Sequence, residues 1–238
     1  MAIILNIETA TETCSVALSN ENGIIDYREN REGKSHASLL TIFIDDILKS
    51  NNFKAADLSA VSISNGPGSY TGLRIGVSTA KGICYGANIP LIAISTLEVL
   101  VAGLMNSPVN QQYINTETLL CPMIDARRLE VYTALFDNAG KMISDISAEI
   151  INESSFQQIF AKKKIVFFGN GANKCKAMLS NENALFIDNI HPLAQNMTSL
   201  SQSHYNNKAF EDVAYFEPFY LKDFVATIPK NKVINRDK

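Results

Sequence analysis

The stretch SNGPGSYTGLRIG, residues 64–76, joins an apolar run at residues 60–63 to a helix-like run that ends near Ala87. Two glycines around Pro67 favour a tight turn, and either Ser69 or Thr71 can cap the helix that follows. Successive backbone N–H groups at such a turn, together with the helix N-terminus, favour an anion. The stretch is therefore either a phosphate-binding loop or a structural joint.

The composition of the chain sets the first limits on its function. The 238 residues are 46% hydrophobic and 19% charged, which is typical of a soluble globular protein of one or two domains. A net charge of −3 gives no broad basic field, so any RNA contact would need a local patch or a partner. Four scattered cysteines without a C-x-x-C pair indicate reduced thiols. With no apolar run long enough to span a bilayer, we expect a cytoplasmic protein.

The order of the expected elements indicates an α/β fold. Strands at residues 3–7, 14–19 and 24–28 are expected to form an antiparallel meander, because an Asn-Gly pair separates the last two. The hydrophobic period then changes, and the following segments are expected to be a helix at 35–49, a strand at 60–64, a helix at 71–87, a strand at 91–94 and a helix at 96–105. A meander followed by alternating helices and strands favours a ribonuclease-H-like mixed sheet with helices on its faces.

A second half is expected after the polar residues 106–118. Its expected strands lie at residues 120–124, 130–136, 142–150 and 164–168, and its expected helices at 154–161, 171–179 and 193–205. We therefore divide the chain into residues 1–106, residues 107–225 and a basic tail, 226–238, that we expect to fray. The similar order of strands and helices in the two halves hints at a duplication.

The two long helices of the first half have more apolar or small surface than one sheet needs. In the helix at 35–49, with Ser35 as N-cap, apolar side chains cover about half of the circumference, and Ile42 stands alone in the polar arc. The helix at 71–87 has Gly72 and Gly76 on one face and Gly82 and Gly86 on a flank, and each interior glycine costs about 1 kcal/mol relative to alanine. Two interpretations stay open for these features. They are close packing within the chain and contact with a partner subunit.

The sequence lacks the common catalytic and nucleotide-binding motifs. Residues 66–72 contain no P-loop lysine, and Thr71 stands where the third glycine of G-x-G-x-x-G would be. The three histidines have no helical pairing, so we expect no metal site. Ser69 is outside a G-x-S-x-G elbow and has no evident base, which argues against a peptidase.

Two groups of charged residues stay open as candidate sites. Glu8 ends the first strand, where many nucleotide-handling folds place a carboxylate, although a solvent-facing strand end is the simpler interpretation. Asp125, Arg127, Arg128 and Glu130 cluster at a strand–turn–strand joint. Their role stays open, because charges at a turn are most often solvated.

Four motifs carry a family resemblance that spans almost the whole chain. They are NGPGSYTGLRIG at residues 65–76, IETATETCSVAL at 7–18, IDARRLEVY at 124–132 and EPFYLK at 217–222. Together they resemble the TsaB (YeaZ) family of the bacterial tRNA threonylcarbamoyladenosine pathway, whose turn motif is G-P-G-S-[FY]-T-G-[LV]-R-I-G. The resemblance implies an actin-like ATPase (ASKHA) fold made of two ribonuclease-H-like halves, each with a mixed sheet and flanking helices.

The resemblance also implies a non-catalytic role, as a scaffold or activator subunit without a cofactor. In the family, such a subunit binds the metal-dependent transferase TsaD, joined by the ATPase TsaE, for N6-threonylcarbamoyladenosine formation beside the tRNA anticodon. The tRNA would be reached only through that complex, and no membrane is involved. TsaD has an H-x-x-x-H pair, whereas here His36 is followed at i+4 by Leu40.

The family pairs through its first two helices, with TsaD or, in its absence, as a homodimer. The residues expected at this interface are His36, Leu39, Leu40, Ile42, Phe43, Leu73, Arg74, Gly76, Val77, Ala80 and Lys81.

Two alternatives to the scaffold are retained. One is an actin-like ATPase or kinase-like enzyme that binds ATP between its halves, with a nucleotide site at Glu8, Gly66, Gly68 and Ser69. Glu8 stands where the family usually has aspartate, and residues 169–173 only loosely match a nucleotide-loop motif, so this site would be vestigial. The other alternative, a glycoprotease-type peptidase, follows an older name for the family that is inherited from TsaD.

Overall fold

The computed structural model describes residues 2–33 and 36–221. The expected N-cap Ser35 and the expected tail at 226–238 lie outside these residues. The first sheet has the order β3-β2-β1-β4-β5. Its strands are β1 (Ile4–Glu8), β2 (Cys14–Asn20), β3 (Gly23–Asn30), β4 (Ala60–Gly66) and β5 (Leu91–Ser95). The first three strands are antiparallel and the last two run parallel to β1, which confirms the predicted meander and mixed sheet.

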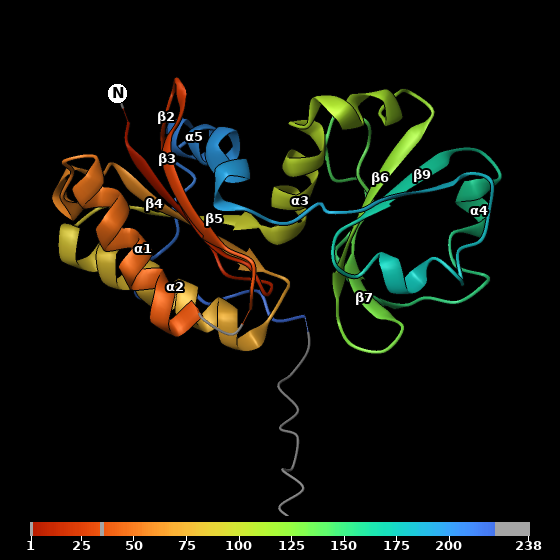
Figure 1. Cartoon of the computed structure of the whole chain (residues 1–238), viewed down its shortest axis with the longest axis horizontal. Helices are drawn as coiled ribbons and strands as arrows, with labels where there is room; N and C mark the ends of the chain where they lie inside the picture. Colours follow the sequence, from red (N-terminus) through yellow and green to blue (C-terminus); the bar gives the residue numbers. More distant parts are fainter. Residues whose placement is uncertain (1, 34–35, 222–238) are drawn as a thin grey trace, which may run out of the picture.

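Helices cover both faces of this sheet. Helices α1 (His36–Ser50) and α2 (Tyr70–Ala87) lie side by side on one face and share its apolar core (Figure 1). The other face packs against α3 (Thr96–Met105), the short helix η4 (Ala194–Met197) and α5 (Thr198–Asn206). The first half therefore has two long helices whose outer surfaces face away from its own sheet.

The second sheet repeats the topology of the first. Its strands are β6 (Thr118–Asp125), β7 (Glu130–Thr133), β8 (Ser147–Ile150), β9 (Lys164–Phe168) and β10 (Ala184–Ile187). The order β8-β7-β6-β9-β10 matches β3-β2-β1-β4-β5, with the same parallel and antiparallel pairs. Two equivalent mixed sheets confirm the expected pair of ribonuclease-H-like halves and support the inferred duplication.

Helix α3 lies between the two halves (Figure 1). Val99 belongs to the core of the first sheet, whereas Leu97, Leu100, Val101 and Leu104 pack into the core of the second sheet. Because both cores bury residues of this one helix, α3 ties the two sheets together.

The helices of the second half are shorter than the sequence predicts. The helix expected at residues 171–179 is replaced by successive turns that include η3 (Asn173–Cys175), and α4 (Gln157–Phe160) is a single turn. Ala172, Cys175 and Leu179 are buried as the helical spacing requires, because successive i→i+3 turns bury nearly the same positions. The strand expected at residues 142–150 is limited to β8, and β10 was not predicted. The two remaining short helices are η1 (Ala55–Asp57) and η2 (Pro108–Tyr113).

The end of the described chain returns to the first half. Glu211 N donates to Leu91 O at 2.9 Å, and Phe219 N donates to Asn65 O at 2.8 Å. Val213 and Phe216 pack against the core beneath α1 and α2. We call residues 211–220 the C-terminal strap. This packing differs from the expected division, in which residues 107–225 form one half, and we propose that residues 194–220 fold with the first half.

Candidate functional site: a docking surface on the first two helices

The glycine turn of residues 66–72 is packed against the loop that follows β1. Ser69 caps α2, because its Oγ accepts from Gly72 N at 3.2 Å, and Ser69 N donates to Ala10 O at 2.6 Å. A Cβ on Gly72 would overlap the carbonyl oxygen of Thr9, and one on Gly68 would overlap that of Ala10. Carbonyl oxygens thus pack directly against the two glycines on the side where a side chain would lie, which is the close packing of a structural joint.

Glu8 lies inside the protein, so the interpretation of a solvent-facing strand end is wrong. The residue is fully buried at the end of β1. Its Oε1 accepts from Ala10 N at 2.5 Å, while Oε2 has no hydrogen-bond partner within the described residues. Burial raises the pKa of Glu8 to about 7, although the hydrogen bond from Ala10 N opposes that rise. At neutral pH, the carboxyl group is therefore protonated in about half of the protein molecules.

Five of the eleven residues expected at a partner interface are buried within the chain. Their side chains or Cα atoms face the sheet under α1 and α2, and they are Leu40, Leu73, Gly76, Val77 and Ala80. A Cβ on Gly76 would overlap Thr9 Oγ1 and lie 2.9 Å from Ile63 Cδ1. This internal contact explains why residue 76 has no side chain. The burial of all five residues corrects the expectation that they form a partner-facing surface.

The outward surface of α1 is more apolar than a solvated helix requires. Ile42 is 59% exposed, and its neighbours Leu39 and Phe43 are half-buried. His36, at the start of the helix, is also half-buried, and its Nε2 lies 3.2 Å from Thr13 O. Their exposure leaves them accessible to a partner, and their place at an interface stays a prediction.

The outward surface of α2 contains two glycines that no contact within residues 2–33 and 36–221 explains. Apart from the adjoining backbone of α2 itself, no atom of these residues would lie within 4 Å of a Cβ added to Gly82 or Gly86, in contrast to Gly72 and Gly76. Between them, Tyr85 is 86% exposed. We use the name docking surface for the exposed and half-buried residues Leu39, Ile42, Phe43, Gly82, Tyr85 and Gly86 on these two adjacent helices.

Arg74 and Lys81, the two basic residues of the expected interface, contact the C-terminal strap. The exposed Arg74 donates from Nε to Tyr220 Oη at 3.2 Å, and its guanidinium carbon lies 4.2 Å from the centre of the Tyr70 ring. Lys81 Nζ donates to the carbonyls of Ala214 and Phe216 at 3.1 and 2.9 Å. The sequence did not predict that the strap lies beside α2, although the EPFYLK motif at residues 217–222 overlaps the strap.

The charged cluster at the β6–β7 joint is an ordered network. Lys174 forms an ion pair with Asp125 and donates to Glu130 O at 2.7 Å. Asn170 connects this network to the first half, because its side chain accepts from Asp125 N and donates to Glu12 Oε2, both at 3.0 Å. The side chains of Arg127 and Arg128 are exposed beside it.

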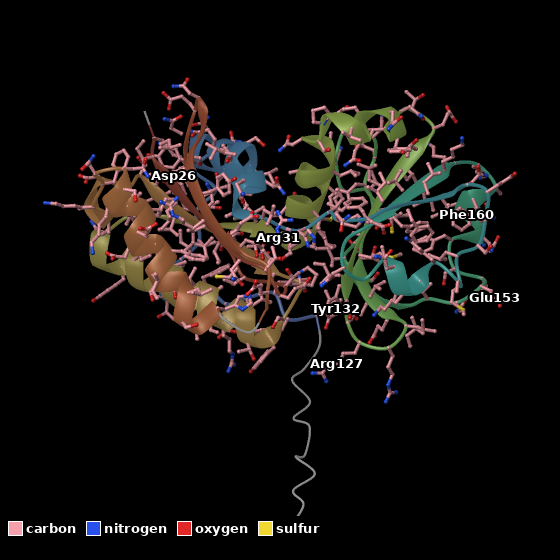
Figure 2. All side chains as sticks on the ribbon, viewed as in Figure 1. Asp26, Arg31, Arg127, Tyr132, Glu153 and Phe160 are labelled. Atoms are coloured by element: carbon pink, nitrogen blue, oxygen red, sulfur yellow. The ribbon has the colours of Figure 1, made fainter. Side chains whose placement is uncertain are left out.

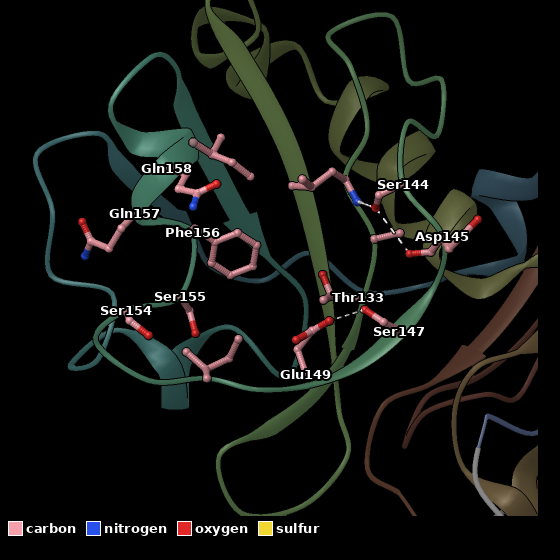
Figure 3. Close-up of a pocket in the computed structure, with 14 residues that line it drawn as sticks. Thr133, Ser144, Asp145, Ser147, Glu149, Ser154, Ser155, Phe156, Gln157 and Gln158 are labelled. Carbon is pink, nitrogen blue, oxygen red and sulfur yellow. Dashed lines mark hydrogen bonds between the residues drawn. The ribbon is translucent and has the colours of Figure 1, made fainter.

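A cavity of about 520 Å³ lies elsewhere, between β7, β8 and α4 (Figure 3). Its polar groups are largely paired with one another. Glu149 Oε1 accepts from Ser147 Oγ at 2.7 Å, and Ser144 Oγ accepts from Leu135 N at 2.8 Å. None of the candidate residues from the sequence lines this cavity.

Residues 2–33 and 36–221 contain no cluster of three or more His, Cys, Asp or Glu side chains that would suit a metal ion. Across the same residues, no helix combines the length and apolar character needed to cross a bilayer.

The duplicated topology and the packed glycine turn place the chain in the class of proteins with the actin-like ATPase (ASKHA) fold. The family model of tRNA N6-adenosine threonylcarbamoyltransferase (TsaD) matches residues 30–230. The chain is 30% identical to the tRNA threonylcarbamoyladenosine biosynthesis protein TsaB of Escherichia coli K12, over 94% of this chain and 96% of that protein. It is 29% identical to the TsaB protein of Bacillus subtilis, over 75% of each chain.

A solved structure agrees with these sequence comparisons. YeaZ from Pseudomonas aeruginosa superimposes with a TM-score of 0.79 at 22% identity, covering 93% of this chain and all of that one. The chain belongs to the TsaB (YeaZ) family, within the wider group of sequences that the transferase model matches.

Proposed function

We propose that the chain is a non-catalytic scaffold or activator subunit for N6-threonylcarbamoyladenosine formation in tRNA. It binds a TsaD-type transferase through the docking surface, and a TsaE-type ATPase joins the assembly. The relatives named as biosynthesis proteins support the pathway, and the match to a transferase model supports kinship with the partner. Without the transferase, the same surface pairs two copies of this chain.

The open glycines of α2 are the observation that carries this proposal. Glycine inside a helix costs about 1 kcal/mol relative to alanine, and no internal contact of Gly82 or Gly86 offsets that cost. A partner helix that packs closely on α2 does offset it, because a missing Cβ lets two backbones approach. The exposed Ile42 on α1 and the exposed Tyr85 on α2 provide apolar area for such a contact.

The geometry around the glycine turn supports a role other than catalysis on a nucleotide. The carbonyl oxygens of Thr9 and Ala10 pack closely against Gly72 and Gly68, and a carbonyl oxygen beside the turn would repel an anion. The nearest carboxyl group, Glu8, is buried and has a pKa of about 7, which suits a magnesium-bound phosphate poorly. Binding of Mg-ATP to the isolated chain at micromolar concentration, with hydrolysis, would favour the ATPase alternative instead.

The test places a charge on the docking surface. Ile42→Glu should weaken binding to purified TsaD at least a hundredfold, because a carboxylate would be buried in an apolar contact. Ile143→Glu is the matched control, since Ile143 is 51% exposed in the second half and Ile42 is 59% exposed. Both affinities are measured by calorimetry on variants whose circular dichroism equals that of the wild type. Equal affinities for the two variants would refute the interface.

A further inference from the structure

The hairpin between β6 and β7 has two arginines where its backbone favours other residues. Arg127 has φ 74° and Arg128 has φ 49°, so both lie in the left-handed region. This conformation costs a non-glycine residue on the order of 1 kcal/mol or more. Tight hairpins normally place Asn-Gly at such positions. The two side chains are thus retained at a cost to stability, which points to a function for them.

Hydrogen bonds fix the backbone of the turn that holds these two arginines, and an ion pair offsets the charge of Asp125 beside them. Asp125 Oδ1 accepts from Arg127 N at 2.8 Å, and the backbones of Ala126 and Glu130 are joined by a hydrogen bond of 3.1 Å. The ion pair with Lys174 offsets the charge of Asp125. Asp125 therefore fixes the turn and pairs with Lys174, and it forms no ion pair with either arginine.

Both arginine side chains are available to an external anion. They are exposed, and within residues 2–33 and 36–221 neither guanidinium forms an ion pair. Figure 2 shows Arg127 at the free end of the hairpin, away from both sheets. In a chain with net charge −3, the tip of this hairpin is a local basic patch of the kind an RNA contact would need.

We propose that Arg127 and Arg128 bind phosphate groups of the tRNA backbone, so that this chain contacts the substrate of the complex directly. The inference rests on the proposed function, and it replaces the expectation that tRNA is reached only through the partners. A guanidinium donates two parallel hydrogen bonds to a phosphate. RNA presents a phosphate at every nucleotide, so two adjacent arginines can bind it without a matched pair of acidic side chains.

The test uses a fluorescein-labelled, unmodified tRNA transcript as the probe. Its affinity is measured by anisotropy between 50 and 300 mM salt, with the full-length chain alone and with TsaD present. The double variant Arg127→Asn with Arg128→Gly removes both charges and suits the left-handed turn, so it should fold at least as well as the wild type. Lys162→Ala with Lys164→Ala removes the same charge from exposed positions elsewhere.

The hairpin variant should bind the transcript at least tenfold more weakly at 100 mM salt. The slope of log K against log salt should fall by about 1.5, because two phosphate contacts are lost. The lysine control should stay within twofold of the wild type, and Arg127→Lys with Arg128→Lys should recover part of the affinity.

Three results would overturn the inference. They are an unchanged affinity of the hairpin variant, an equal loss in the lysine control, and loss of TsaD binding while tRNA affinity is retained. The last result would assign the hairpin to an acidic protein surface. Failure of the proposed function is seen separately, as a wild-type chain that does not bind TsaD in the same experiment.

Discussion

Equivalent glycine turns follow β4 in the first half and β9 in the second, and they lead to different structures. Both pack against the end of the central strand of their sheet. A Cβ on Gly72 would overlap the carbonyl of Thr9 after β1, and one on Gly171 would lie 2.9 Å from the carbonyl carbon of Ile124 in β6. The first turn continues into α2, with 18 residues, whereas the second continues into η3, with three.

The difference shows that the turn is a structural joint in both halves, and that only the first half adds a long helix to it. That helix lies beside α1, so the first half has two adjacent outward surfaces (Figure 1). The second half instead has an exposed charged hairpin at the end of its central strand. The same topology therefore supports an apolar docking surface in one half and a basic tip in the other.

The largest expected effect on the free energy of unfolding comes from the carboxyl groups at the ends of the two central strands, β1 and β6. Glu8 is buried, whereas the equivalent Asp125 is exposed and ion-paired with Lys174. Because burial raises the pKa of Glu8 from 4.5 to about 7, the folded state holds its proton more tightly than the unfolded state. The stabilisation from this proton is complete below pH 4.5 and is lost as the pH rises to 7.

Glu8→Gln should remove this dependence and raise the free energy of unfolding by about 3 kcal/mol at pH 8, with little change at pH 4.5. Urea unfolding at the two pH values measures it. Asp125→Asn is the matched change in the second half and should alter the free energy by about 1 kcal/mol or less. If the Glu8→Gln protein is less stable than the wild type at pH 8, the folded chain stabilises the negative charge of the buried Glu8 carboxylate, and the prediction is wrong.

The next largest effect on stability is expected on the face of α2 that packs against the chain's own sheet. Gly76→Ala should lower the free energy of unfolding by about 2 kcal/mol, because the new Cβ would overlap Thr9 Oγ1 and crowd Ile63. Thermal and urea unfolding measure the loss. An unchanged stability would mean that the end of β1 moves freely away from α2, and the joint would be looser than the packing indicates.

Much of the fold follows from local patterns in the sequence. Alternating runs and the Asn22-Gly23 turn predict the first meander, and the long helices follow from their period and the Ser69 cap. The strand β10 and the loss of a helix at 171–179 were not predictable in this way, because a four-residue edge strand has little pattern and i→i+3 turns bury nearly the same positions as a helix. The return of the C-terminal strap depends on long-range contacts.

The candidate site was predicted less completely than the fold. The helical wheel identified Ile42 and placed Gly72 and Gly76 on one face with Gly82 and Gly86 on a flank, but it could not tell which of these surfaces packs on the chain's own sheet. That distinction depends on Thr9 and Ile63, which are distant in sequence from α2. Burial of Glu8 likewise depends on how the strands and loops assemble around it.

The most direct test of the docking surface is the affinity of the Gly82→Ala, Gly86→Ala double variant for TsaD. Each alanine should stabilise the isolated chain by up to about 1 kcal/mol, because both sites are open helical positions. The same two methyl groups should weaken TsaD binding at least tenfold, since they separate α2 from the partner backbone. A variant that is more stable and binds TsaD as tightly as the wild type would contradict the account.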